Sequence, residues 1–213
     1  MIVRVLVAAL VLLAAAGGAA ALTREEATAD LANRTDADAR RRGVTWLAEH
    51  GTMSDLPRLA EALRDSDPAV RIVAESAMWQ VWSRSGDEET DRLLALGIEQ
   101  MNAREGQGAV ETFTKIIARR PEFAEGWNKR ATVHYLLGEY KKSLKDCDEV
   151  MKRNPYHFGA LSGYGMIYLQ LDWPEQALAY FERALAVNPN LESVRESADT
   201  LRQLLIERRK NTL

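Results

Sequence analysis

The chain has 213 residues, of which 46% are hydrophobic and 28% charged, and its formal net charge is −3. This length and composition can bury a sizeable core in one domain or two small ones. The acidic balance argues against nucleic acid as a partner, because phosphate binding needs a concentrated basic surface, and the short basic runs at 40–42 and 208–210 are expected to be solvated helix faces.

The first residues have the order of an export signal. In "MIVRVLVAALVLLAAAGGAAALTREE" one cation, Arg4, precedes an apolar run at 5–16, and small residues continue to Ala21. This order predicts that residues 1–21 are removed on export, to the bacterial periplasm. The alternative is an uncleaved anchor, because residues 5–22 are about long enough to span a bilayer. Contact with a membrane is expected only in that case.

Residues 22–86 are expected to form a helical segment of their own. Asp67 is placed to cap a helix that begins at Pro68, where the missing backbone donor costs nothing. An upstream helix is expected at 37–51. The run "LAEALRDSDPAVRIVAESA" resembles the HEAT repeat family, whose second helices often open with aspartate-proline-x-valine-arginine. The resemblance implies a packed helix pair and carries no activity with it.

Residues 87–190 repeat with a period of 34 residues, which is the interval between Pro121, Pro155 and Pro189. Other columns keep this interval. The first unit has Leu93, Leu96, Gly97, Ala109 and Phe113, and the third has Leu161, Tyr164, Gly165, Tyr168, Ala177 and Phe181. This pattern resembles the tetratricopeptide repeat, with units at about 90–123, 124–157 and 158–189.

The columns have a physical meaning. Small residues at Gly97, Ala131 and Gly165 let the two helices of a unit approach, while Phe113 and Phe181 fill the gap against the next unit. The prolines end one helix pair and precede the next, since proline lacks the donor that a helix interior requires. An apolar stripe in 191–213 predicts a capping helix for the last unit. It consists of Val194, Ala198, Leu201, Leu204 and Leu205.

The predicted fold is therefore all-α. It is a right-handed superhelical stack of antiparallel helix pairs, an α-solenoid. A HEAT-like pair is followed by three tetratricopeptide-like units and the C-terminal cap.

The second unit departs from the pattern at three positions. Arg130 stands where leucine is usual, and Ser143 and Cys147 replace alanine and phenylalanine. We expect Arg130 to pair with Asp146 or Asp148, or else to extend to the surface, and Arg130→Met to be milder than loss of the paired carboxylate. Cys147, the single cysteine, cannot form an internal disulfide, and we expect a buried thiol rather than a reactive one.

No motif indicates catalysis. The sequence has no glycine-rich phosphate loop, no cysteine pair for zinc and no G-x-S-x-G turn, and His50, His134 and His157 lack ligand spacing. The sequence therefore predicts a protein that is not an enzyme and has no metal and no cofactor.

The resemblance to tetratricopeptide proteins implies a concave groove, lined by the first helix of each unit, that holds a peptide. The residues expected there are Ile98, Asn102, Asn128, Lys129, Thr132, Tyr135, Ser162, Gly163 and Met166. Asn128 is expected to bond a peptide backbone and Lys129 to meet a carboxylate. Because these two lie in one unit only, a full clamp for a C-terminal carboxylate is not expected.

The predicted function is an exported, non-catalytic interaction module or assembly scaffold that binds a protein or peptide segment in the groove. Two alternatives remain open. The first is a membrane-tethered assembly factor, if the apolar segment at 5–22 is retained. The second is an accessory subunit of an envelope enzyme, with a large permanent interface.

Overall fold

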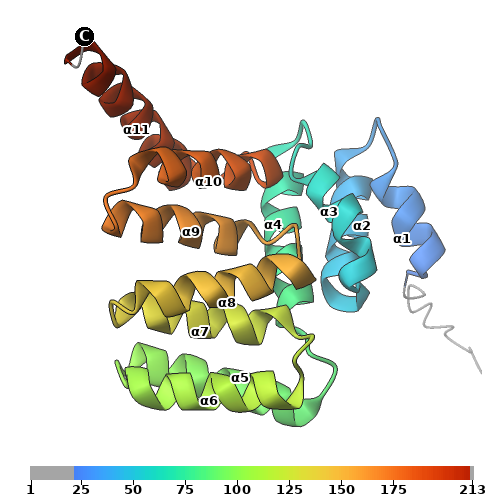
Figure 1. The fold of residues 1–213 in the computed structure, drawn as a ribbon. Coiled ribbons are helices and arrows are strands. Elements are labelled where there is room, and N and C mark those ends of the chain that lie inside the picture. Colours follow the sequence, from blue (N-terminus) through green and yellow to red (C-terminus); the bar gives the residue numbers. More distant parts are fainter. Residues whose placement is uncertain (1–21, 212–213) are drawn as a thin grey trace, which may run out of the picture.

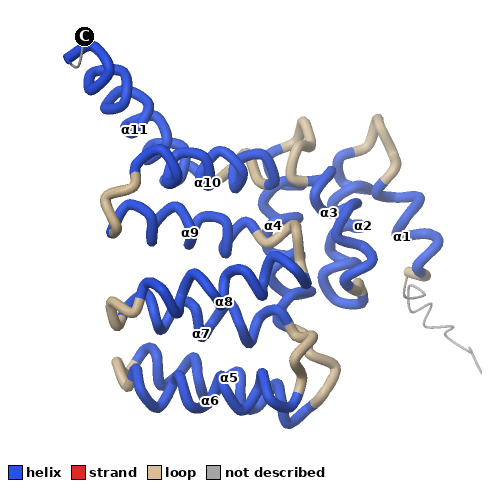
Figure 2. Tube along the Cα trace, in the orientation of Figure 1, coloured by secondary structure: helices blue, strands red, loops and turns tan. Residues whose placement is uncertain are grey.

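The computed structural model describes residues 22–211, so the predicted export signal at 1–21 lies outside the described residues. The described part consists of helices and loops, without a strand (Figure 2). Its N-terminal helices are α1 (Arg24–Leu31), α2 (Ala37–His50), the 3₁₀ helix η1 (Met53–Asp55), α3 (Leu56–Ala62) and α4 (Pro68–Ser83). The later helices are α5 (Glu88–Asn102), α6 (Gly106–Arg119), α7 (Ala124–Leu136), α8 (Tyr140–Arg153), α9 (Phe158–Gln170), α10 (Pro174–Val187) and α11 (Glu192–Asn211).

Local sequence determines where the N-terminal helices begin. Asp67 caps α4 by accepting hydrogen bonds from the backbone N–H groups of Ala69 and Val70, at 2.8 and 3.2 Å. Pro68 is the first residue of this helix, as predicted. The side chain of Asp36 caps α2 in the same way. These caps satisfy backbone donors that have no partner inside the helix.

Helices α5 to α10 form three antiparallel pairs stacked side by side, and α11 packs on the last pair (Figure 1). In the first and third pairs a glycine lies directly beneath a phenylalanine ring. A Cβ atom on Gly97 would collide with Phe113, and one on Gly165 would collide with Phe181. Both rings also join core clusters with the following helices. The predicted all-α stack of helix pairs is therefore confirmed.

The second pair, α7 and α8, is joined by an ion pair in addition to apolar contacts. Arg130 of α7 donates two hydrogen bonds of 2.8 Å to the carboxylate of Asp146 on α8. Asp148, the other candidate partner, instead accepts a hydrogen bond from the Tyr164 hydroxyl. Cys147 is buried, as predicted, and burial raises the pKa of its thiol to about 12. The structure thus confirms the paired arrangement and selects Asp146.

The N-terminal helices pack against the edge of the stack. In Figure 1, α4 runs across the axes of α7 and α9, beside the loops that join successive units. Phe158, the first residue of α9, is buried in the same core cluster as Met78 of α4. Arg64 donates a hydrogen bond of 3.1 Å to the backbone carbonyl of Val187, at the end of α10. One core cluster therefore joins the N-terminal helices to the third pair.

Candidate functional site

The predicted groove residues belong to α5, α7 and α9, the first helices of the three pairs, and we call the exposed side of these helices the first-helix face. Five of the predicted residues gather around one cavity: Asn128, Thr132, Tyr135, Gly163 and Met166. Ile98 packs beside the core cluster of the first unit, and Asn102 is exposed at the end of α5. The Ser162 hydroxyl donates to the backbone carbonyl of Phe158 at 2.8 Å. These three do not line the cavity.

The cavity between α7 and α9 has a volume of about 110 Å³. Cys147 and Ala131, both buried, contribute to its wall. The hydroxyl of Ser143 also lies there and donates to the carbonyl of Ala131 at 2.7 Å. No charged side chain lines the cavity, so its chemistry is that of an apolar recess.

Two predicted groove residues have partners within the protein. The Lys129 ammonium lies 3.0 Å from the Glu125 carboxylate. The side-chain amide of Asn128 donates to both oxygens of Glu125, at 3.2 and 3.3 Å. Both groups therefore hold a carboxylate of the same helix, and the roles toward a peptide expected from the sequence stay predictions. Asn128 is moreover buried, at 7% exposure, so it offers little surface to a ligand.

Glu125 is the centre of a buried polar cluster. His157 Nε2 lies 3.0 Å from its carboxylate, and both side chains are fully buried. The Nδ1 atom of His157 accepts from the Ala160 N–H at 3.0 Å, so Nε2 carries the proton that is donated to Glu125. Burial by itself would raise the pKa of Glu125, but the His157 hydrogen bond and the Lys129 charge outweigh it, and the pKa lies below its usual value.

Comparison with known proteins identifies the repeat. The sequence profile of the tetratricopeptide repeat (TPR) matches residues 158–191. A TPR repeat-containing protein of Rhizobium etli is 31% identical over 142 residues, which cover 67% of this chain and 69% of that protein. The chain belongs to the TPR family.

Two solved TPR structures show the same fold. The first TPR of RPAP3, bound to an HSP90 peptide, has a TM-score of 0.54 at 21% identity and covers 56% of this chain and 96% of that one. The Sgt2 TPR domain from Aspergillus fumigatus has a TM-score of 0.55 at 18% identity, and the match covers 58% of this chain and 83% of that one.

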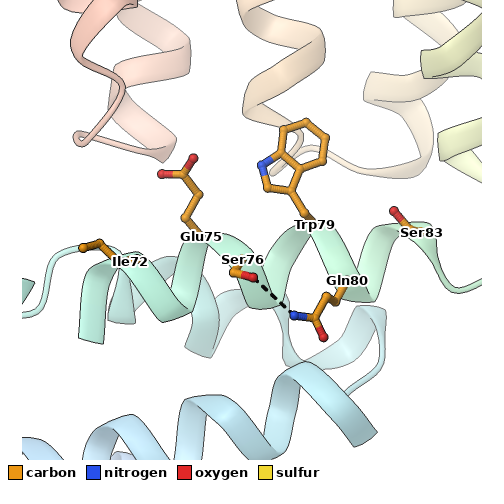
Figure 3. Close-up of a pocket in the computed structure, with 6 residues that line it drawn as sticks. All are labelled: Ile72, Glu75, Ser76, Trp79, Gln80 and Ser83. Carbon is orange, nitrogen blue, oxygen red and sulfur yellow. Dashed lines mark hydrogen bonds between the residues drawn. The ribbon is translucent and has the colours of Figure 1, made fainter. Parts of the chain in front are cut away.

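Helix α4 borders the TPR first-helix face. The Lys129 ammonium lies over the Trp79 indole, 5.9 Å from the ring centre, and a Cβ atom on Gly159 would approach this indole to 2.7 Å. Figure 3 shows Trp79 and Glu75 pointing from α4 toward the neighbouring helices, with Ser76 and Gln80 joined by a hydrogen bond of 3.2 Å. A shallow depression of about 640 Å³ runs along this side of α4. Trp79 therefore connects the two halves at the edge of the site.

The first-helix face exposes large apolar side chains. Met166 is 41% exposed, and Leu136 and Leu169 are 65% and 36% exposed. Leu136 occupies the same column of the repeat as Asn102, and Leu169 the same column as Tyr135. These leucines were not among the predicted residues, although the 34-residue spacing places them on this face.

Residues 22–211 contain no group of three or more His, Cys, Asp or Glu residues arranged to hold a metal ion. They also include no helix that is both long and apolar enough to cross a membrane.

Proposed function

We propose that the protein is a non-catalytic interaction module that holds an unstructured peptide segment along the first-helix face of the TPR stack. The observation that carries the proposal is the exposure of large apolar side chains on α7 and α9, with Leu136 at 65% and Met166, which lines the cavity, at 41%. Large apolar side chains clustered on a surface mark sites of association.

The size of the cavity favours a peptide over a small-molecule ligand. Pockets for drug-sized ligands measure about 300–1,000 Å³ and enclose most of the ligand. The recess in the first-helix face is about 110 Å³, which suits one side chain rather than a whole cofactor. The surrounding surface would contact the rest of an extended segment.

The structural neighbours support a peptide as the ligand. The RPAP3 domain holds an HSP90 peptide on the same fold. In this chain, however, Lys129 is engaged by Glu125, which lies in the same helix. We therefore propose recognition of an internal segment through its side chains, without capture of a terminal carboxylate. The tethered assembly factor would differ only in retaining residues 5–22, whereas the enzyme accessory subunit would use a large permanent interface instead.

A selected peptide provides the test. Linear peptides would be selected from a random display library on the wild-type protein and titrated by fluorescence anisotropy. Tyr135→Ala should weaken binding by about 1–3 kcal/mol, because aromatic anchors supply much of the energy of such interfaces. Lys145→Ala on α8 serves as an exposed control. Equal affinities for wild type and Tyr135→Ala would contradict the proposal. Tyr135 is preferred to Asn128 because Asn128 belongs to the Glu125 cluster.

We further propose that the protein is exported and that residues 1–21 are removed. The support is the order of cation, apolar run and small residues in the sequence. Intact-mass measurement of protein recovered from the producing cell envelope tests this. A mass that includes residues 1–21 would favour the membrane-tethered alternative.

A further inference from the structure

The cavity on the first-helix face lies where the middle unit departs from the repeat. The column that holds Phe113 and Phe181 in the outer units holds Cys147 in the middle unit. In the outer units the ring covers a glycine so closely that a Cβ atom there would collide with it. The middle unit has Ala131 in place of that glycine. Its methyl group takes up only part of the space that a phenylalanine ring would fill.

The space that remains is the cavity of about 110 Å³, bounded by Ala131, Cys147 and Ile167. A well-packed interior seldom leaves such a void. Here the void reaches the first-helix face, because Gly163 at its border has no side chain, and a Cβ atom there would meet only the Cys147 sulfur, at 3.9 Å. The backbone of a bound segment could therefore come close to the opening.

We propose that this cavity is an anchor site for a single aliphatic side chain of the bound peptide, of the size of valine, leucine, isoleucine or methionine. This inference rests on the proposed function and specifies which side chain the groove selects.

Three observations determine the chemical class. No charged residue lines the cavity, so an ionised side chain would lose its hydration without a partner. The hydroxyl hydrogens of Ser143 and Thr132 are already donated to backbone carbonyls, at 2.7 and 3.0 Å. The Cys147 thiol is kept neutral by its raised pKa. An uncharged, apolar group is therefore the favoured occupant.

The volume limits the size of the occupant. An apolar cavity of about 150 Å³ binds benzene. A recess of about 110 Å³ is smaller, so it matches a branched or linear aliphatic group more closely than an aromatic ring. The exposed side chain of Met166 borders the recess, and its flexibility allows several aliphatic shapes to be covered.

The repeat itself suggests the variant that fills the cavity. Ala131→Gly combined with Cys147→Phe would copy the glycine and phenylalanine pair of the outer units. Cys147→Phe alone should be destabilised, because the Ala131 methyl group would meet the new ring. Gly163→Leu provides an independent variant, which blocks the cavity from α9.

The test uses the display-selected peptides and the full chain. We expect them to share one aliphatic position, and its replacement by alanine should weaken binding to wild type about tenfold or more, as burial of such a side chain implies. The double variant and Gly163→Leu should bind the original peptide about tenfold or more weakly and should be insensitive to that alanine replacement.

The possible failures are distinguishable. If peptides bind in a manner that depends on Tyr135 but neither filled variant changes their affinity, the anchor is refuted and the proposed function stands. If affinity is unchanged in Tyr135→Ala as well, both proposals are refuted. Selected peptides without a shared aliphatic position would refute the anchor even if the double variant does not fold.

Discussion

The ion pair between α7 and α8 predicts an order of stability among variants. The side chain of Asp146 is 5% exposed and that of Arg130 is 17% exposed. In Arg130→Met the carboxylate of Asp146 stays buried, with His134 Nε2 at 3.8 Å. In Asp146→Ala the guanidinium keeps the Thr114 hydroxyl and the face of Trp127, and its long side chain can turn toward water. Loss of the arginine should therefore be the more costly change.

The magnitudes follow from burial. Removing one partner of a buried pair costs about 3–5 kcal/mol, and an exposed pair is worth less than about 1 kcal/mol. Arg130→Met should lower the free energy of unfolding by about 3 kcal/mol, near the lower end of the range for a buried pair. Asp146→Ala should lower it by about 1–2 kcal/mol, between the values for buried and exposed pairs. This is the reverse of the order expected from the sequence, in which Arg130→Met was the milder change.

Equilibrium unfolding in urea, followed by circular dichroism, measures these differences. In a chain of this size each kcal/mol also lowers Tm by about 2–4 °C. The double variant Arg130→Met with Asp146→Leu removes both charges and should be more stable than Arg130→Met alone. Lys142→Met, which removes an exposed pair with Glu139, is the control and should resemble wild type. The reasoning is wrong if Arg130→Met unfolds like wild type, or if the double variant recovers nothing.

Three further predictions concern single residues. The pKa of Glu125 is lowered from its usual 4.5, so its contribution to stability is present above that pH and is lost as the pH falls through the lowered value. Glu125→Gln should therefore show a shallower loss of stability in urea titrations below pH 4.5, and equal acid slopes would contradict this. Cys147, 3% exposed and with a raised pKa, should react with iodoacetamide at least about tenfold more slowly in native than in denatured protein, and equal rates would show that it is accessible. Gly97→Ala should lower the free energy of unfolding by about 1–3 kcal/mol, because the new Cβ atom would collide with the Phe113 ring. Gly163→Ala should be neutral or stabilising by up to about 1 kcal/mol, because its Cβ atom would meet only the Cys147 sulfur, at 3.9 Å. The reverse order of the two variants in thermal unfolding would contradict this account.

The repeat architecture could be predicted because its information is local. A glycine and a phenylalanine at fixed spacing specify how two consecutive helices meet, and Gly97 with Phe113 meets this requirement within one unit. The Asp67 cap is equally local. The position of α4 could not be derived in this way, because periodicity describes contacts between neighbouring units and gives no information on contacts across the stack. The resemblance of 22–86 to HEAT repeats stays a prediction.

The candidate site was predictable in part. The spacing placed Thr132, Tyr135 and Met166 at one cavity. The contact of Lys129 with Glu125, four residues earlier on the same helix, was not predicted, although this spacing brings two side chains together on a helix.

The burial of His157 could also be inferred from the sequence. His157 occupies a column that holds Phe123 in the first unit and Leu191 after the third. A titratable residue in an otherwise apolar column indicates a buried polar contact. Its partner, and the stacking of Trp82 on its ring at 4.3 Å, depend on the fold.

The contacts of α4 and its adjoining loop with the C-terminal units have a consequence for how the chain folds. An uninterrupted solenoid can fold from any unit outward, because each unit needs only its neighbours. Here Arg64 meets a partner 123 positions later in the sequence, and the Leu63 carbonyl meets one 127 positions later. Closing such distant contacts costs chain entropy and slows folding. During synthesis the N-terminal helices therefore cannot form these contacts until the third unit has been made, and part of their apolar surface stays exposed to water until then.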